Sequence, residues 1–230
     1  MRRLFPRVPR RSLGLVVQAD GLALAQASAP AQGQAHVQHW HWLASPQEPK
    51  THQPLLSGWP DPSWVRQARQ SAGCLAQDVA LAIEDQRLRR LSLSLASGLG
   101  VREQVKAIES ELSKQLPWSL ADTVWDFHHL PTPQADSAAS PALRPAWLLA
   151  AMQAQAVQHV EVLATQRAWV AACEHWCRAA GLWLVRLEPT WQAEDRWRRH
   201  SHPVSTHKIE VLAPELQARV GGLALGVLAP

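Results

Sequence analysis

The segment at residues 101–127, VREQVKAIESELSKQLPWSLADTVWDF, constrains the fold most, because helix, turn and strand signals follow one another in it without ambiguity. Its valines, isoleucine and leucines recur at helical spacing, so one face of the helix is apolar while glutamates and lysines face water. Pro117 ends the helix, because its ring lacks a donor N–H and pushes the preceding residue towards extended geometry. The run Val-Trp-Asp-Phe at residues 124–127 then predicts a strand.

Length and composition limit the class of protein. A chain of 230 residues is long enough for one good core or two small lobes. With 47% hydrophobic and 18% charged residues, wholesale disorder is excluded. No apolar run approaches the ~18 residues that a membrane-spanning helix needs. The three cysteines give no disulfide framework, which fits a reducing cytoplasm.

The N-terminus is strongly basic. Five of the positive charges lie within residues 1–11, which we expect to form a basic, disordered tail. Contact with anionic lipid head groups or with nucleic acid is the functional alternative, since each basic residue near an acidic surface contributes roughly 1 kcal/mol. A signal peptide is not expected, because Gln18, Asp20 and Gly21 interrupt the apolar core that it would need.

Residues 12–85 begin with the pattern of three antiparallel strands. Alternating apolar residues on either side of the Asp20-Gly21 turn predict a hairpin. The third strand, at residues 35–43, alternates so that Val37, His39, His41 and Leu43 share one face. The other face then carries Trp40 and Trp42.

A loop, a helix and a buried strand complete this part. Residues 44–60 are rich in proline and polar residues, and they predict the loop. Asp61 and Pro62 start the helix as N-cap and first-turn proline, and Gly73 ends it. Residues 77–84 predict the buried strand.

The remaining chain alternates between strands and helices. Residues 131–145, PTPQADSAASPALRP, have no periodicity and predict a Pro/Ala/Ser linker. Residues 191–207 predict a charged loop. We expect strands at residues 91–95, 160–164, 182–187 and 209–212, and helices at residues 146–157, 166–180 and 214–225.

The 101–127 segment also resembles a family. A glutamate-rich helix that ends in Leu-Pro-Trp, an acidic turn at Asp122 and the sequence Val-Trp-Asp-Phe are similar to the hallmark of PilM-type proteins. These are the actin-like, FtsA-related proteins of type IV pilus assembly. Residues 160–182 resemble the family's apolar strand, long helix and Ala-Gly-Leu, and residues 222–226 resemble its C-terminal Gly-Leu-Ala sequence.

The resemblance implies a fold of the α/β (α+β) class. Residues 12–85 with 182–230 are expected to form an actin-like, ribonuclease H-like core lobe. Residues 86–181 are expected to form an inserted small α/β subdomain. Little sequence is left for the second actin lobe, which we expect to be missing. Because actin-like proteins hold ATP between two lobes, the missing lobe argues against nucleotide binding.

The phosphate-binding residues of the family are not matched. Where the resemblance implies an Asp in a Gly-x-Asp sequence of the first hairpin, this chain has Val16, and Asp20 lies at the turn instead. The sequence has no Gly-x-x-x-x-Gly-Lys-Ser/Thr loop. We therefore expect neither a bound ATP cofactor nor ATP hydrolysis.

Histidine clusters are weighed as metal sites or catalytic groups. His39 and His41 share a strand face, a spacing that suits a metal, but without a nearby carboxylate or cysteine they are better explained as half-buried aromatics. The other histidines lie near no Gly-x-Ser-x-Gly elbow, so no catalytic triad is expected. These histidines include His128, His129, His200 and His202.

The cysteine pair of the 166–180 helix gives no metal site either. Cys173 and Cys177 share one face of this helix while His175 points away, so the three cannot bind one ion. Buried apolar thiols are the favoured explanation.

The loop Arg196–Arg199, with Trp191 and Trp197, offers charge and stacking surfaces for single-stranded nucleic acid. A solvated loop that replaces the missing lobe is the favoured explanation, and we expect no nucleic acid partner.

The resemblance implies a non-catalytic adaptor of type IV pilus or competence-pilus assembly on the cytoplasmic face of the bacterial inner membrane. Its expected partner is the cytoplasmic N-terminal segment of a PilN-like bitopic membrane protein, with a PilO-like protein engaged indirectly. Leu116, Pro117 and Trp118 are the candidate partner-binding residues. The alternatives are a degenerate ATP-binding protein that completes its cleft with a partner, and a nucleic-acid-binding protein.

Overall fold

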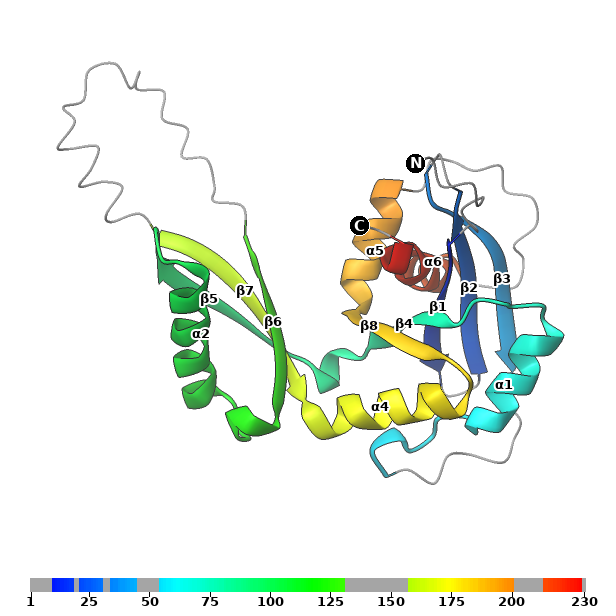
Figure 1. Ribbon diagram of the computed structural model, residues 1–230, viewed down its shortest axis with the longest axis horizontal. Helices are drawn as coiled ribbons and strands as arrows, with labels where there is room; N and C mark the ends of the chain where they lie inside the picture. Colours follow the sequence, from blue (N-terminus) through cyan, green and yellow to red (C-terminus); the bar gives the residue numbers. More distant parts are fainter. Residues whose placement is uncertain are drawn as a thin grey trace, which may run out of the picture. The chain divides into compact units, whose positions relative to one another are not determined.

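The computed structural model describes residues 10–18, 21–30, 34–44, 54–130, 157–200 and 213–228. These residues divide into two compact units, which are described separately (Figure 1). The first unit holds the described residues up to Asp85 and from Trp169 onwards, and the second unit holds those of Gln86–Ala168.

A five-stranded sheet of order β3-β2-β1-β4-β8 forms the centre of the first unit. Strands β1 (Arg10–Gln18), β2 (Gly21–Ala29) and β3 (His36–Ala44) are antiparallel neighbours, which confirms the expected hairpin and third strand. Strand β4 (Asp78–Ile83) is parallel to β1, and β8 (Trp183–Pro189) is parallel to β4. The mixed sheet therefore belongs to the α+β class.

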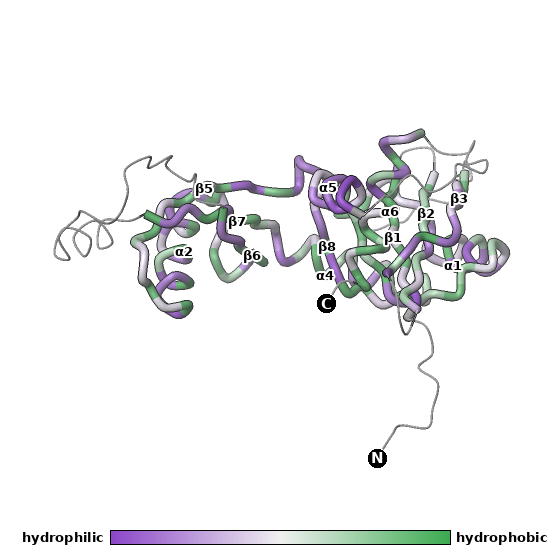
Figure 2. Tube along the Cα trace, turned by 90° about the horizontal axis from the view of Figure 1, so that it is seen from above, coloured by the Kyte–Doolittle hydropathy of each residue, from purple (hydrophilic) through white to green (hydrophobic). Residues whose placement is uncertain are grey.

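One face of this sheet is covered by α6 (Pro214–Leu228), on which α5 (Thr190–His200) packs in turn (Figure 1). Apolar residues of β1, β2, β4, α5 and α6 form one buried cluster, the α6 cluster. The second half of α6 carries only apolar residues and glycines, whereas α5 is mostly hydrophilic (Figure 2). A helical stretch that is apolar all round belongs in a core, so this half of α6 lies between the sheet and α5.

Glycine allows α6 to approach its neighbours closely. A Cβ atom built at Gly14 of β1 would overlap the carbonyl oxygen of Val220, and one built at Gly222 would overlap that of Ala193 in α5. Both glycines are therefore required by backbone contact. Gly222 and Gly226 belong to the C-terminal sequence that resembles the family.

Helices α1 (Pro62–Ser71) and α4 (Arg167–Ala179) are joined by polar contacts in the first unit. Trp176 donates its indole N–H to the carbonyl of Pro60 at 2.9 Å, and Arg66 donates to the carbonyl of Ala179. These contacts hold α4, from Trp169 onwards, in the first unit. The Asp61 N-cap is confirmed, since its carboxylate accepts the N–H of Ser63 at 2.8 Å.

The second unit is a three-stranded antiparallel sheet covered on one face by a helix. Its strand order is β5-β7-β6, with β5 (Arg89–Ala96), β7 (Val157–Gln166) and β6 (Thr123–His129). Helix α2 (Val101–Gln115) contributes Ile108 and Leu112 to a second buried core, the α2 cluster. The helix, its end before Pro117 and the following strand are confirmed.

The expected charged loop at residues 191–207 is wrong over its first part, because α5 extends to His200. Its charges are spaced to pair along a helix: Arg198 lies 2.8 Å from Asp195 and 3.6 Å from Glu194. Ala193 and Trp197 supply the apolar face that packs on the α6 cluster.

The expected alternation of β3 is also wrong at its start. Ala27 pairs with Val37 and the adjacent Gln26 pairs with His39, so Gln38 is an extra residue in a β-bulge. The bulge reverses the alternation, and Val37 consequently packs on the α6 cluster together with Trp40 and Trp42.

Some expectations lie wholly or partly outside the described residues. These are the tail before Arg10, the Asp20 turn position, the 131–145 linker, the helix at residues 146–156 and the strand at residues 209–212. Strand β1 begins at Arg10, so the last two residues of the expected tail pair with β2. None of the described helices has the length and hydropathy needed to cross a bilayer.

Candidate functional site

A cavity of about 430 Å³ lies at the carboxyl ends of β1 and β4, where open α/β sheets commonly bind ligands. We call it the strand-end cavity. Its lining residues are Val16, Val17, Gln18, Trp59, Ala82, Glu84, Thr190 and Arg219. It is the place in the first unit where the resemblance implies a nucleotide.

The residues of the strand-end cavity do not fit a metal-bound triphosphate. Val16 is 6% exposed and packs into the α6 cluster, so the position of the implied Asp is apolar. Glu84 is the single carboxylate among the lining residues. The space beside Gly14 is filled by the backbone of α6, so this glycine serves helix packing and leaves no room for a phosphate. Asp20 lies outside the described residues.

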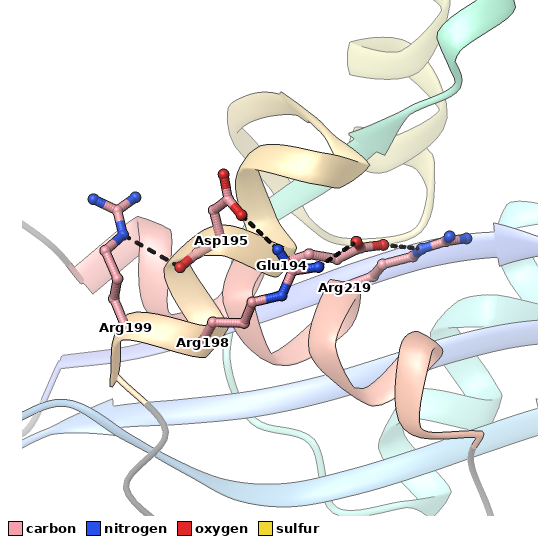
Figure 3. Close-up of polar contacts among 5 residues, drawn as sticks. All are labelled: Glu194, Asp195, Arg198, Arg199 and Arg219. Carbon is pink, nitrogen blue, oxygen red and sulfur yellow. Dashed lines mark hydrogen bonds and ion pairs between the residues drawn. The ribbon is translucent and has the colours of Figure 1, made fainter. Parts of the chain in front are cut away.

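Arg219, the one cation of the cavity lining, belongs to an ionic network between α5 and α6 (Figure 3). Its Nε atom donates to Oε1 of Glu194 at 2.6 Å. On α5, Arg198 donates to Asp195 at 2.8 Å, and Nε of Arg199 donates to the carbonyl oxygen of Asp195 at 3.2 Å. Arg198 and Arg199 are thus both held by Asp195 of their own helix, α5.

A buried ion pair joins β8 to α5. The Glu188 carboxylate is 3% exposed, and both of its oxygens lie 2.7 Å from the guanidinium of Arg196. Arg196 also donates to the carbonyl of Gly222 at 3.1 Å, and its guanidinium occupies the space that a side chain at position 226 would need. Glu188, near the end of β8, is therefore a packing partner of α5 and α6.

The aromatic residues of α5 have apolar partners. The ring of Trp197 lies 5.3 Å from that of Trp40 in an edge-to-face arrangement, and it packs against the α6 cluster. Such a ring is engaged in the core of the unit. This contact and the ion pair of Arg196 with Glu188 explain the positions of Trp197 and Arg196, two of the residues that the sequence offered for nucleic acid binding.

The histidine and cysteine candidates have ordinary environments. The rings of His39 and His41 stack at 6.3 Å, and burial, with His39 nearby, lowers the pKa of His41. All three cysteines are buried and free, and burial raises the pKa of the Cys177 thiol to about 12. Within the described part of the chain, no group of three metal-type side chains is brought together.

The predicted partner-binding residues follow α2 in the second unit. Leu116 is the C-cap of α2 and packs partly against the α2 cluster. Pro117 is exposed, and Trp118 is half-buried with its indole N–H donating to Oγ1 of Thr123 at 3.0 Å. The three form one short segment between α2 and the 3-10 turn Leu120–Asp122, and their binding role stays a prediction.

A second cavity, which the sequence analysis missed, lies between β5 and α2. Its volume is about 450 Å³, and we call it the β5 groove. It is lined by Ser92, Leu93, Ser94, Leu95, Ala96, Leu99, Ala107, Ser110 and Glu111. The sequence signal for it is the run Ser-Leu-Ser-Leu-Ala, in which small residues alternate with the leucines of the core.

Comparison with known proteins gives a likeness of fold. No protein-family model and no curated protein matches the sequence. A chain of the solved "PilM-PilN type IV pilus biogenesis complex" matches 82% of this chain with a TM-score of 0.59 and 19% identity. This chain spans 49% of that chain's length. The described residues therefore share a mixed α/β fold with a chain of a pilus biogenesis complex.

Two further solved structures are more distant. The cytoplasmic domain of EpsL, an inner membrane component of the type II secretion system of Vibrio cholerae, matches 81% of this chain with a TM-score of 0.46 and 14% identity, and this chain covers 59% of it. T. thermophilus RuvC in complex with a Holliday junction matches 94% of this chain with a TM-score of 0.37 and 10% identity, and 90% of RuvC is covered. Both scores are below 0.5, so only the first match bears on the fold.

Proposed function

We propose that this chain is a non-catalytic adaptor of type IV pilus or competence-pilus assembly. The observation that carries the proposal is the fold shared with a chain of the PilM–PilN complex over 82% of this chain. The hallmark segment that resembles PilM-type proteins forms α2, the following turn and β6. The adaptor acts at the inner face of the bacterial inner membrane, and a PilO-like protein is engaged indirectly.

The proposed partner is the cytoplasmic N-terminal segment of a PilN-like bitopic membrane protein. An extended segment is held by main-chain hydrogen bonds, with apolar pockets that select its side chains. Pro117 is exposed and Trp118 is half-buried, so both offer apolar surface at the end of α2. Leu116 supports them from the α2 cluster.

The non-catalytic part of the proposal is supported by the strand-end cavity. Apolar Val16 stands where the resemblance implies an Asp, and Arg219 is paired with Glu194. These side chains supply neither a metal-binding carboxylate pair nor a free cation for a phosphate. The adaptor is therefore proposed to act without a cofactor.

Peptide binding tests the function directly. The full chain is titrated into a fluorescein-labelled peptide of the partner's cytoplasmic segment, and anisotropy is followed against a scrambled peptide. We expect saturable binding of the native sequence only, and Trp118→Ala to weaken it at least tenfold, which corresponds to about 1.4 kcal/mol.

Trp183→Ala is the matched control, because Trp183 is another partly exposed tryptophan, 59% exposed on β8. Equal binding of native and scrambled peptides would end the proposal. An equal loss of peptide affinity in the Trp118 and Trp183 variants would mean that Trp118 is not part of the binding site.

A degenerate ATP-binding protein is the second candidate, favoured by the position of the strand-end cavity at the carboxyl ends of β1 and β4. A ligand that binds the native state stabilises it by RT ln(1 + [L]/Kd). Under the adaptor proposal, millimolar Mg-ATP leaves the melting temperature unchanged. A rise of several degrees would favour the second candidate.

A further inference from the structure

Four strands of the described residues are sheet edges: β3 and β8 in the first unit, and β5 and β6 in the second. An edge strand presents unpaired N–H and C=O groups that another extended segment can join. Proteins usually close such edges with bulges, prolines or charged side chains. The four edges differ in this respect.

Three of these edge strands have features that hinder the pairing of a further strand. Strand β3 has the bulge at Gln38, and β8 has a bulge at Val185 and ends at Pro189. On β6, the carboxylate of Asp126 accepts the backbone N–H of Phe127 at 2.8 Å, so a side chain already engages this strand's backbone. A fourth strand would add poorly at each of them.

Strand β5 has neither a bulge nor a proline, and its charged side chains are confined to its first two positions, Arg89 and Arg90. Its eight residues pair with β7 from Arg89 to Ala96 without any register shift. Ser92, Ser94 and Ala96 are small and exposed, so no bulky side chain shields the edge. Beside it lies the β5 groove, which has room for the side chains of an incoming segment.

The charges near this edge indicate the chemistry of its occupant. Glu111, the one charged residue that lines the β5 groove, is already paired with Lys114 at 2.7 Å. Arg87, in the 3-10 turn before β5, and Arg89, at the start of β5, are exposed, and in the part of the chain that the structure describes neither forms an ion pair. Against the one carboxylate of that turn, Asp85, the two arginines leave a net positive charge, which favours an acidic residue in the partner.

We propose that an extended, apolar segment with an acidic residue at one end adds to β5 as a fourth strand of the second sheet. Its alternate apolar side chains enter the β5 groove against α2, and its acidic residue faces Arg89. This inference rests on the proposed function, since it takes the occupant to be the cytoplasmic segment of the PilN-like partner.

One of the predicted partner residues shares its core with the strand that borders the β5 groove. Leu91, near the start of β5, and Leu116, at the end of α2, pack against the same cluster. Trp118 instead donates to Thr123 at the start of β6, the opposite edge of the sheet, so it is a surface separate from the β5 groove.

Two variants with matched controls test the inference in the full chain, using the same labelled peptide. Ser110→Trp fills the groove from an exposed position of α2, whereas Ser113→Trp places the same ring at an exposed position that does not line it. Arg89→Glu reverses the charge at the edge, and Arg102→Glu reverses an exposed charge on α2. We expect Ser110→Trp and Arg89→Glu each to weaken peptide binding at least tenfold. The controls Ser113→Trp and Arg102→Glu should change it less than twofold.

Hydrogen exchange of the backbone amides distinguishes strand addition at β5 from peptide binding at another surface. Peptide binding is expected to slow exchange of the amides of residues 91–96 in the wild-type chain, because an added strand takes up their free N–H groups. Protection elsewhere, or equal binding by all four variants, would overturn strand addition while the peptide-binding function stands. No binding of the peptide to the wild-type chain would overturn both.

Discussion

At the scale of single residues, Glu188 and Arg196 form a largely buried ion pair in the first unit. Both side chains are largely buried, at 3% and 16% exposure. Removing one partner of such a pair leaves an uncompensated buried charge, which costs about 3–5 kcal/mol. We therefore expect Glu188→Gln to lower the free energy of unfolding by about 3 kcal/mol in urea titrations.

The double variant Glu188→Gln/Arg196→Met is the control. Because it buries no charge, we expect it to recover at least half of the stability that the single variant loses. A double variant less stable than the single one would mean that the hydrogen bond from Arg196 to Gly222, and not the ion pair, holds α5 in place.

Cys177 gives a pH prediction at the same scale. Burial raises the pKa of its thiol from 9.0 to about 12. Since the folded pKa is the higher one, its contribution to stability is complete below pH 9 and is lost as the pH rises from 9 towards 12. At pH 8 the native thiol is neutral and shielded.

A thiol reagent measures this directly. At pH 8 we expect dithionitrobenzoate to react only slowly with the native chain and to modify all three buried cysteines after denaturation. Cys177→Ala should remove one of the three equivalents. Rapid reaction of one equivalent with the native chain, lost in this variant, would show that Cys177 is accessible.

At the scale of elements, α6 depends on glycine for its place between the sheet and α5. Helix propensity alone predicts that Gly222→Ala stabilises the chain by about 1 kcal/mol. Packing predicts the opposite, because the new methyl group would overlap the backbone of Ala193. Overpacking typically costs about 1–3 kcal/mol; after the gain in helix propensity, we expect a net loss of up to about 2 kcal/mol in urea unfolding.

Gly100→Ala is the matched control. A Cβ atom built at Gly100 meets nothing closer than Oε2 of Glu103 at 3.7 Å, and its backbone angles suit any residue. We expect a change below about 1 kcal/mol, the usual cost of alanine at an N-cap. A Gly222→Ala variant as stable as this control would mean that α5 moves away easily.

The same elements show what the sequence can and cannot predict. Helix α2 follows from the sequence because its apolar spacing and Pro117 are local signals. Helix α5 does not, because its apolar face is narrow and is completed only by contact with α6. The bulge at Gln38 and the β5 groove depend on which strands become neighbours, and this information is not local.

At the scale of the whole molecule, the α6 cluster and the α2 cluster lie in different units of the described chain. Val220 is fully buried in the α6 cluster of the first unit, and Ile108 is fully buried in the α2 cluster of the second. Because large-to-small core changes destabilise the structure around the cavity that they leave, each cluster can be weakened separately. The pair Ile108→Ala and Val220→Ala therefore tests whether the units are stabilised independently.

Hydrogen exchange measured by mass spectrometry reports on each sheet. Ile108→Ala removes about 2–5 kcal/mol of core stability, so we expect faster exchange in β5, β6 and β7 with little change in β1, β2 and β4. Val220→Ala should produce the reverse pattern, because Val220 packs beneath Gly14 and Ala80 in the first sheet. Faster exchange in both sheets for either variant would mean that the two units unfold as one cooperative body.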